Sequence, residues 1–254
     1  MNTNLEKLIN AYKNETEKKC YQINLVDGKT SILDDKIGGI PYLPNGESYP
    51  IDETGKMMGL VLQVNLKNIK LDNWPTSGIL EIFIDSSLKY PCQYEIRYYD
   101  EGLDYQTNLP YVSLEGFIVD EPIKIEIEEA ICHKPLSNFD GEETLLNIAK
   151  KLFKQKFNTF NELDDFINTS DFYVEFMESL SIPYGTIGGY ADFTQNDPRE
   201  YEGKERTDCL LKLDCCLDNE RLYIGDTGIL FVLIKPEDII NKKFENGVVD
   251  WDCY

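Results

Sequence analysis

Apolar residues recur at helical spacing in two separate parts of the chain. Near the start, four of them fall on one face and predict an amphipathic helix over about residues 4–18: Leu5, Leu8, Ile9 and Tyr12. A second helical pattern occupies about residues 141–180, with one apolar stripe over 145–157 and a further helix over 171–180. We therefore expect an N-terminal helix and a helical insert.

Elsewhere the apolar residues alternate with polar ones or form short continuous runs, as they do in β-strands. Strands are predicted over residues 21–26, 60–66, 78–85, 93–99, 123–128, 209–214 and 228–234, with a short helix at 236–241. Successive strands in the first part follow each other without helical crossovers, which favours antiparallel pairing. The predicted fold class is α+β, with mostly antiparallel sheets.

The chain repeats itself at an offset of 150 residues. Ile37-Gly38-Gly39 recurs as Ile187-Gly188-Gly189, and a Gly-Ile-Leu strand begins 39 residues after each pair, at Gly78 and at Gly228. A self-similarity this long indicates two related halves. We expect a single compact domain over residues 1–254, with tandem halves at about 20–135 and 180–254 related by a pseudo-twofold.

The chain carries 46 acidic and 25 basic residues, a formal net charge of −21. A field of this sign repels phosphate backbones and anionic lipid, so nucleic acid and membrane surfaces are disfavoured as partners. It attracts basic proteins, although the same excess of acids also serves solubility alone. A basic protein partner and plain solubility are both open interpretations.

Seven cysteines, an odd number without a Cys-x-x-Cys pair, do not form the pattern of a secreted disulfide framework. The first residues lack a secretory signal, and no apolar run reaches the roughly 18–20 residues that span a bilayer. We therefore expect a cytoplasmic protein whose thiols are reduced and act as small buried hydrophobes.

Common catalytic patterns are missing from the sequence. His133 is the only histidine, which excludes a histidine-rich zinc site and leaves one usual base near neutral pH. The nucleophile elbow, the phosphate-binding lysine loop and the dinucleotide glycine fingerprint do not occur. We assign no catalytic residue, metal ligand or cofactor, and an enzymatic role is disfavoured without being excluded.

The double glycines have two interpretations. They supply positive φ angles and let segments approach closely, which makes Gly38, Gly39, Gly188 and Gly189 architectural. Alternatively, both loops line one cleft between the halves, where ligand pockets tend to form. The aromatic walls of that cleft would then include Tyr42 and Tyr190.

Acidic residues gather on predicted loops and strand ends of the second half: Asp192, Asp197, Asp214, Asp226, Asp250 and Asp252. Converging carboxylates can hold calcium or magnesium, but such acids are more commonly solvated or cap turns. Arg199 is expected to pair with one of them and order the long loop. As ligand-binding candidates we select Asp192, Arg199, Asp214 and Asp226.

Several ordered motifs resemble the YwqG-like family, a bacterial domain of unknown function. They are Gly-Gly with Pro41, Leu62-Gln63-Val64-Asn65, the strand from Gly78, Gly188-Gly189-Tyr190 leading to Asp197-Pro198-Arg199, Ile224-Gly225-Asp226-Thr227-Gly228, and Trp251-Asp252-Cys253. The resemblance runs from about residue 20 to the end. It implies an α+β protein of two related halves without an established activity, and an association with toxin systems that suggests an immunity or accessory role. Two positions differ from the family pattern. Tyr49 stands before Pro50, where a tryptophan or other aromatic residue is expected, and Tyr184 stands where a histidine is expected.

Two functional hypotheses follow. The first is a non-enzymatic binding protein that acts through its acidic surface on a protein partner, as an immunity-type or toxin-system accessory factor. The alternative is a small-ligand or metal-binding protein, or a cryptic enzyme, that uses a cleft between the two repeats. The charge favours the first hypothesis, and the paired glycine loops favour the second.

Overall fold

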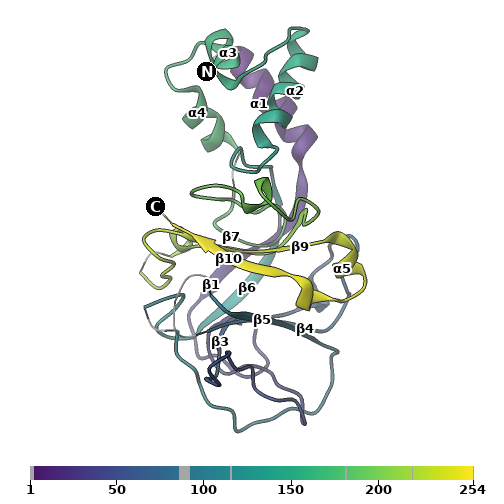
Figure 1. Cartoon of the computed structure of the whole chain (residues 1–254), viewed down its shortest axis with the longest axis vertical. Helices are drawn as coiled ribbons and strands as arrows, with labels where there is room; N and C mark the ends of the chain where they lie inside the picture. The colour runs from purple at the N-terminus through teal and green to yellow at the C-terminus, as the bar shows by residue number, and fades with distance from the viewer. Residues whose placement is uncertain (1–2, 86–91, 115, 181, 219, 254) are drawn as a thin grey trace.

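The computed structural model describes residues 3–85, 92–114, 116–180, 182–218 and 220–253, and shows a cluster of helices at one end of a curved β-sheet (Figure 1). The α-helices are α1 (Thr3–Thr16), α2 (Gly141–Phe153), α3 (Phe160–Ile167), α4 (Phe172–Ser179) and α5 (Pro236–Ile240). The strands are β1 (Lys18–Val26), β2 (Lys36–Ile37), β3 (Gly59–Asn65), β4 (Ile79–Ile84), β5 (Tyr94–Tyr99), β6 (Ile123–Cys132), β7 (Gly185–Gly188), β8 (Asp208–Asp214), β9 (Ile229–Ile234) and β10 (Val248–Asp252). Short 3-10 helices are η1 (Leu66–Asn68), η2 (Pro198–Glu200), η3 (Cys215–Leu217) and η4 (Phe244–Asn246).

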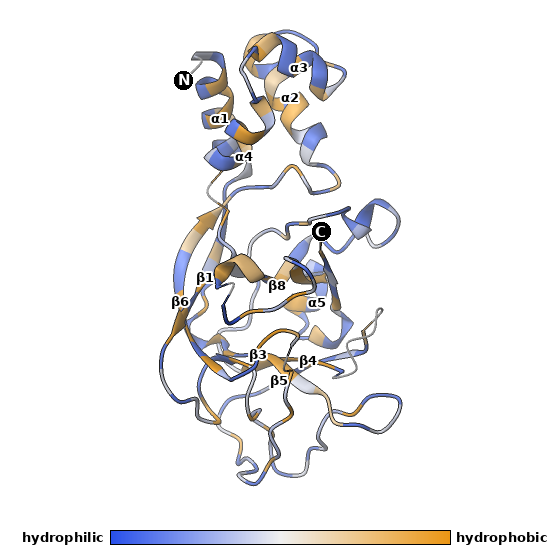
Figure 2. Ribbon diagram, turned by 90° about the vertical axis from the view of Figure 1, so that its left-hand side faces the viewer, coloured by the Kyte–Doolittle hydropathy of each residue, from blue (hydrophilic) through white to orange (hydrophobic). Residues whose placement is uncertain are grey.

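Helices α1 to α4 form a cluster with a core of its own, at one end of the molecule (Figures 1 and 2). The predicted stripe on α1 is confirmed, since Leu5, Leu8 and Tyr12 are fully buried. The Tyr12 ring meets Phe176 of α4 edge to face, with centroids 5.1 Å apart. Helix α3 is absent from the predicted elements because two turns give too short an apolar pattern. The N-terminal helix and the insert thus share one core, although they are far apart in sequence.

The ten strands form one sheet in the order β10-β9-β8-β7-β1-β6-β2-β3-β4-β5, and its pairings are antiparallel. The expected antiparallel pairing is confirmed, but there is a single sheet where several were predicted. Strands β1 and β6, which the sequence assigned to the first half, lie in the middle. Their long ladder, from Lys18 opposite Cys132 to Val26 opposite Lys124, separates the two repeated sets of strands.

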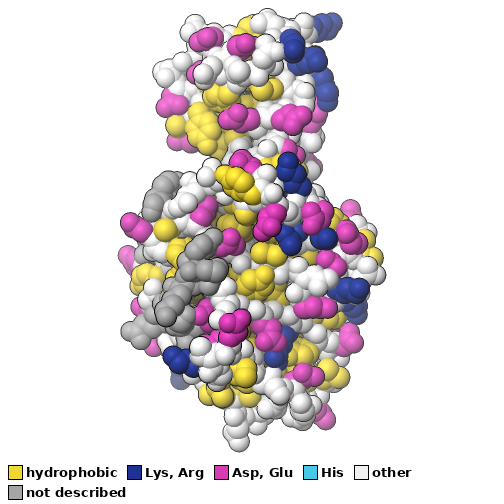
Figure 3. All heavy atoms as spheres, viewed as in Figure 1, with side chains coloured by type: hydrophobic (Ala, Val, Ile, Leu, Met, Phe, Trp, Pro, Cys, Tyr) yellow, Lys and Arg dark blue, Asp and Glu magenta, His cyan; other side chains and the backbone are white. Residues whose placement is uncertain are grey.

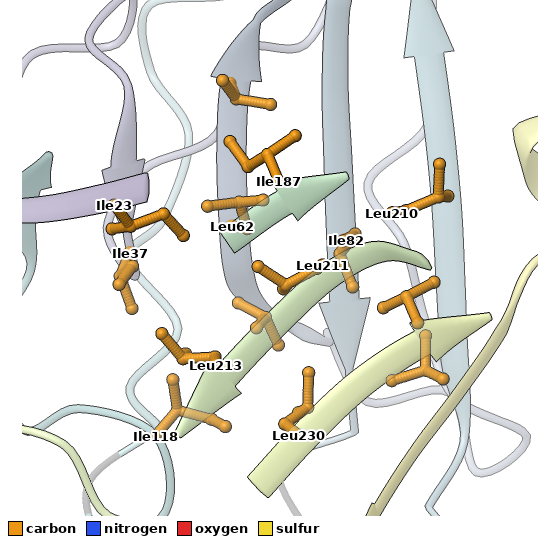
Figure 4. Close-up of a cluster of buried hydrophobic side chains, with 14 of the residues drawn as sticks. Ile23, Ile37, Leu62, Ile82, Ile118, Ile187, Leu210, Leu211, Leu213 and Leu230 are labelled. Carbon is orange, nitrogen blue, oxygen red and sulfur yellow. The ribbon is translucent and has the colours of Figure 1, made fainter. Parts of the chain in front are cut away.

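The sheet bends so that β2–β5 and β7–β10 face each other across the main core. Leu62 and Ile82 from one side and Leu211 and Leu230 from the other are at most 1% exposed, and Figure 4 shows them pointing into the shared space. Phe244 also packs against Tyr98 of β5, with ring centroids 5.3 Å apart. This contact brings the β10 end of the sheet close to the β5 end, which gives the nearly closed shape of a barrel.

The sequence repeat has a counterpart in the backbone pairing. The β3–β4 ladder contains a bulge between Leu60 and Leu62, and the β8–β9 ladder contains one between Cys209 and Leu211. Both β3 and β8 run directly into a 3-10 helix, η1 or η3. The two sets of strands therefore share an irregularity of register as well as their order outward from the centre.

A long segment follows each glycine pair and packs on the outer face of its own strands, the face turned away from the main core. Tyr49 contacts Phe83 of β4 with ring centroids 6.3 Å apart, and Phe193 contacts Phe231 of β9 at 4.8 Å. These contacts place residues 40–58 over one outer face and residues 190–207 over the other.

In the part of the chain described, the helices are too short or too polar to cross a bilayer.

Candidate functional site

The glycine pairs form tight corners of the backbone. Their φ angles are 72° at Gly38, 91° at Gly39, 76° at Gly188 and 82° at Gly189, a region that side chains with a Cβ rarely adopt. A Cβ on Gly189 would lie 2.6 Å from the Cys132 sulfur, so the close approach also requires glycine. These contacts support the architectural interpretation of both pairs.

The two pairs line different pockets. Gly39 borders a pocket of about 320 Å³ with Ile32 and Pro122. Gly188 and Gly189 border another of about 140 Å³, beside Lys18 and Asp208. The structure thus gives each glycine corner its own small pocket, where the sequence suggested a shared cleft as one alternative.

The candidate aromatic residues are also separated. Tyr42 is 2% exposed, and its ring contacts Tyr99 edge to face and Tyr105 at a tilt. Its hydroxyl donates to the Leu103 carbonyl at 2.9 Å. Its backbone N–H donates to the Gln63 amide oxygen at 2.7 Å, which fixes the first loop to β3. Tyr190 instead lies near two lysines, with Lys18 Nζ 5.2 Å and Lys134 Nζ 6.0 Å from its ring centroid. Burial raises the pKa of the Tyr190 hydroxyl to about 12, so it remains a neutral contact.

Arg199 forms a buried clamp with Asp197, as the sequence predicted. The Arg199 Nε and Nη2 donate to the two Asp197 carboxylate oxygens at 2.7–3.1 Å, and Nη2 also donates to the Asn138 side-chain oxygen at 2.9 Å. The Arg199 residue is 4% exposed and Asp197 is 0% exposed. Because Asn138 precedes α2, this clamp ties residues 190–207 to the base of the helical cluster, and Arg199 is unavailable to a ligand.

The other acidic candidates occupy different places. Asp192 accepts a hydrogen bond from the Ser137 hydroxyl at 2.6 Å, a second tie to the segment before α2. Asp214 ends β8, and its side chain accepts from the Cys216 N–H at 2.7 Å. Asp226 is exposed in the turn before β9. The structure thus assigns Asp192 and Asp214 local capping and tethering contacts.

A pocket of about 460 Å³ lies between residues 190–207 and the edge strand β10, and we call it the β10 pocket. Its lining combines carboxylates, amides and aromatic rings: Gln195, Asn196, Pro198, Tyr201, Phe231, Asp250, Trp251, Asp252 and Cys253. Asp250 and Asp252 are two positions apart on β10, so their side chains lie on the same face of the strand, the outer one. Tyr201, at 79% exposed, stands at the rim. The clamp of Asp197 and Arg199 holds the loop that forms one wall.

The two carboxylates of this pocket have no cationic partner among the described residues. One Asp252 oxygen accepts the backbone N–H groups of Thr194 and Gln195, both at 3.0 Å, and Asp250 accepts from the Trp251 N–H at 2.8 Å. Burial first, and then the charge of Asp252, raises the pKa of Asp250 above its ordinary value. As far as the structure describes the chain, the pocket lining includes no lysine or arginine. A cation entering the pocket would therefore relieve an unfavourable charge arrangement.

A second polar group lies beneath residues 40–58, and none of its members is a site residue predicted from the sequence. Lys36, Gln63, Glu81 and Arg97 stand opposite one another on β2, β3, β4 and β5. Glu81 is fully buried, and its carboxyl oxygens have no hydrogen-bond partner in the described part of the chain. Burial raises its pKa to about 8, although the Lys36 charge opposes the shift. The available signal was the single charged residue Glu81 within the otherwise apolar strand β4.

A family model described as Domain of unknown function (DUF1963) matches residues 35–253 of the chain. No curated protein matches it. The matched range begins just before β2 and includes both glycine corners, the clamp and the β10 pocket, but leaves α1 and β1 outside.

Proposed function

This chain belongs to the family described as domain of unknown function DUF1963, a description that names no activity, and we therefore propose a function from the geometry of the chain itself. We propose that it is a non-enzymatic protein that binds a basic protein partner. A lysine or arginine side chain of the partner enters the β10 pocket. There its cationic group meets Asp250 and Asp252. The observation that carries the proposal is this pair of carboxylates in a pocket to which the described residues contribute no cation.

The surface charge supports the same partner chemistry. Acidic residues outnumber basic ones by 46 to 25, and Figure 3 shows acidic side chains spread over the helical cluster and the sheet on the face in view. A negative field accelerates the encounter with a basic protein, whereas affinity depends on a few well-placed contacts. Tyr201 adds an exposed ring at the rim, which suits contact with a guanidinium or ammonium group.

Three finer inferences belong to this proposal. The repeated bulge and the matching strand order support a pseudo-twofold between the two sets of strands. Seven free cysteines support a cytoplasmic setting. The YwqG-like resemblance implies an immunity or accessory role beside a toxin. Such a role would be consistent with binding to a basic protein partner.

Labelled oligoarginine and oligolysine peptides test the proposal by fluorescence anisotropy at low and moderate salt. We expect binding to the wild type, and the double variant Asp250→Asn/Asp252→Asn should bind at least about tenfold more weakly. The matched control is Glu126→Gln/Glu128→Gln, which removes the same two charges from exposed positions on β6. That control should change the affinity little.

Two results would contradict the proposal. Equal weakening by both double variants would mean that only net charge matters, and absence of binding at low salt would remove the basic partner. Acetylated arginine amide provides a further arm. If this small molecule binds as tightly as the peptides, the pocket is a small-ligand site and not a contact for a protein.

A further inference from the structure

Two cysteines and one aspartate meet at the end of β8. Asp214 is the last residue of that strand, and Cys215 and Cys216 begin η3. One carboxylate oxygen and the two sulfur atoms all lie within 4.8 Å of one another. Cys215 is 5% exposed, whereas Cys216 is exposed. One side of this group is therefore buried in the protein, and the other side is exposed to solvent.

The first half of the chain contains the same turn with different side chains. Asn65 accepts from the Lys67 N–H at 3.0 Å, as Asp214 accepts from the Cys216 N–H at 2.7 Å. The N–H of the next residue also bonds to a glycine carbonyl in both copies, Leu66 to Gly78 at 2.8 Å and Cys215 to Gly228 at 3.1 Å. The backbone conformation thus needs neither a carboxylate nor a thiol.

The chemistry of the group suits a borderline-soft divalent cation. Thiolates and a carboxylate are ligands of zinc, and tetrahedral bonds of about 2.3 Å place two sulfurs about 3.8 Å apart. The three ligand atoms of this group already lie within 4.8 Å of one another, near that spacing. Because a metal binds the thiolate form of cysteine, a cation bound here would replace the protons of the two thiols.

We propose that Asp214, Cys215 and Cys216 form a binding site for zinc or a metal of similar softness. The three side chains supply three ligands, and the exposed side of Cys216 leaves a fourth position to water. One Asp214 oxygen keeps the hydrogen bond to the Cys216 N–H, and the other binds the metal. This proposal is independent of the basic partner and of the β10 pocket.

Cobalt titration of the full chain under reducing conditions tests the site. We expect a thiolate-to-cobalt charge-transfer band that saturates at one metal per chain, with release of about two protons for each metal bound. Zinc should then displace cobalt and abolish the band. The variant Cys215→Leu/Cys216→Lys introduces the residues that occupy the equivalent turn of the first half, Leu66 and Lys67. It should remain folded but lose the charge-transfer band.

Two further variants complete the test. Asp214→Asn keeps the turn, as Asn65 does, and should weaken cobalt affinity at least about tenfold. Cys253→Ser is the control for a partly exposed thiol elsewhere and should bind as the wild type does. A missing band in the wild type overturns the proposal, and so does a band that survives in Cys215→Leu/Cys216→Lys with unchanged affinity. Circular dichroism verifies that each variant is folded.

Discussion

Replacing Asp197 by alanine removes the only carboxylate that contacts the Arg199 guanidinium among the described residues. The remaining acceptors of that cation are the Asn138 side chain at 2.9 Å and the Arg206 carbonyl at 3.2 Å. Neither carries a compensating charge. Because Arg199 is 4% exposed, the variant leaves a nearly buried cation unpaired, which costs about 3–5 kcal/mol.

The loss should also reach two backbone segments. Asp197 accepts N–H groups of Arg199 and Phe139, both at 2.9 Å, and these donors lose their acceptor in the variant. The double variant Asp197→Ala/Arg199→Met removes the buried cation as well. We therefore expect it to be less destabilised than the sum of the single variants, by about 0.5–3 kcal/mol.

Urea unfolding, followed by fluorescence and by circular dichroism, measures these effects. For Asp197→Ala we expect the midpoint to fall by about 1–2 M. Lys151→Ala is the control, since its partner Glu15 lies at 3.0 Å in an exposed pair, and such pairs contribute little. A midpoint for Asp197→Ala like that of the control would contradict a stabilising clamp, and so would additive effects of the two clamp substitutions.

Two further predictions concern buried groups. The folded chain keeps Glu81 protonated up to a pKa of about 8 whereas the unfolded chain ionises it near 4.5, so wild-type stability should fall as the pH rises from 5 to 8. At about 1.4 kcal/mol per pKa unit, the loss of stability is of the order of a few kcal/mol. The variant Glu81→Gln should show a smaller fall in urea midpoint over the same pH range. An equal fall would mean that Glu81 does not cause the pH dependence. Gly189→Ala should cost about 2–4 kcal/mol, because its Cβ meets Cys132 and its φ is positive. Gly46→Ala, whose φ is 95° with no atom within 4 Å, should cost only the backbone part of about 1–2 kcal/mol, and similar losses in thermal unfolding would exclude the packing effect.

Local pattern in the sequence determined many of the elements and the corners that join them. The spacing of Leu5, Leu8 and Tyr12 predicted α1 because a helix brings such positions to one face within a few turns. The repeated glycines predicted two equivalent corners, and Arg199 was expected to pair with a nearby acid, which proved to be Asp197. Each of these inferences depends on residues that lie close together in the chain.

Only the tertiary structure decided which distant segments lie together. It placed β1 and β6 between the repeated strands, joined α1 to a core that begins more than a hundred residues later, and set Glu81 opposite Arg97. It also brought the second loop over Asp250 to form the β10 pocket. Strand register and loop packing follow from the burial of many side chains at once, and no local period in the sequence specifies which strands pair.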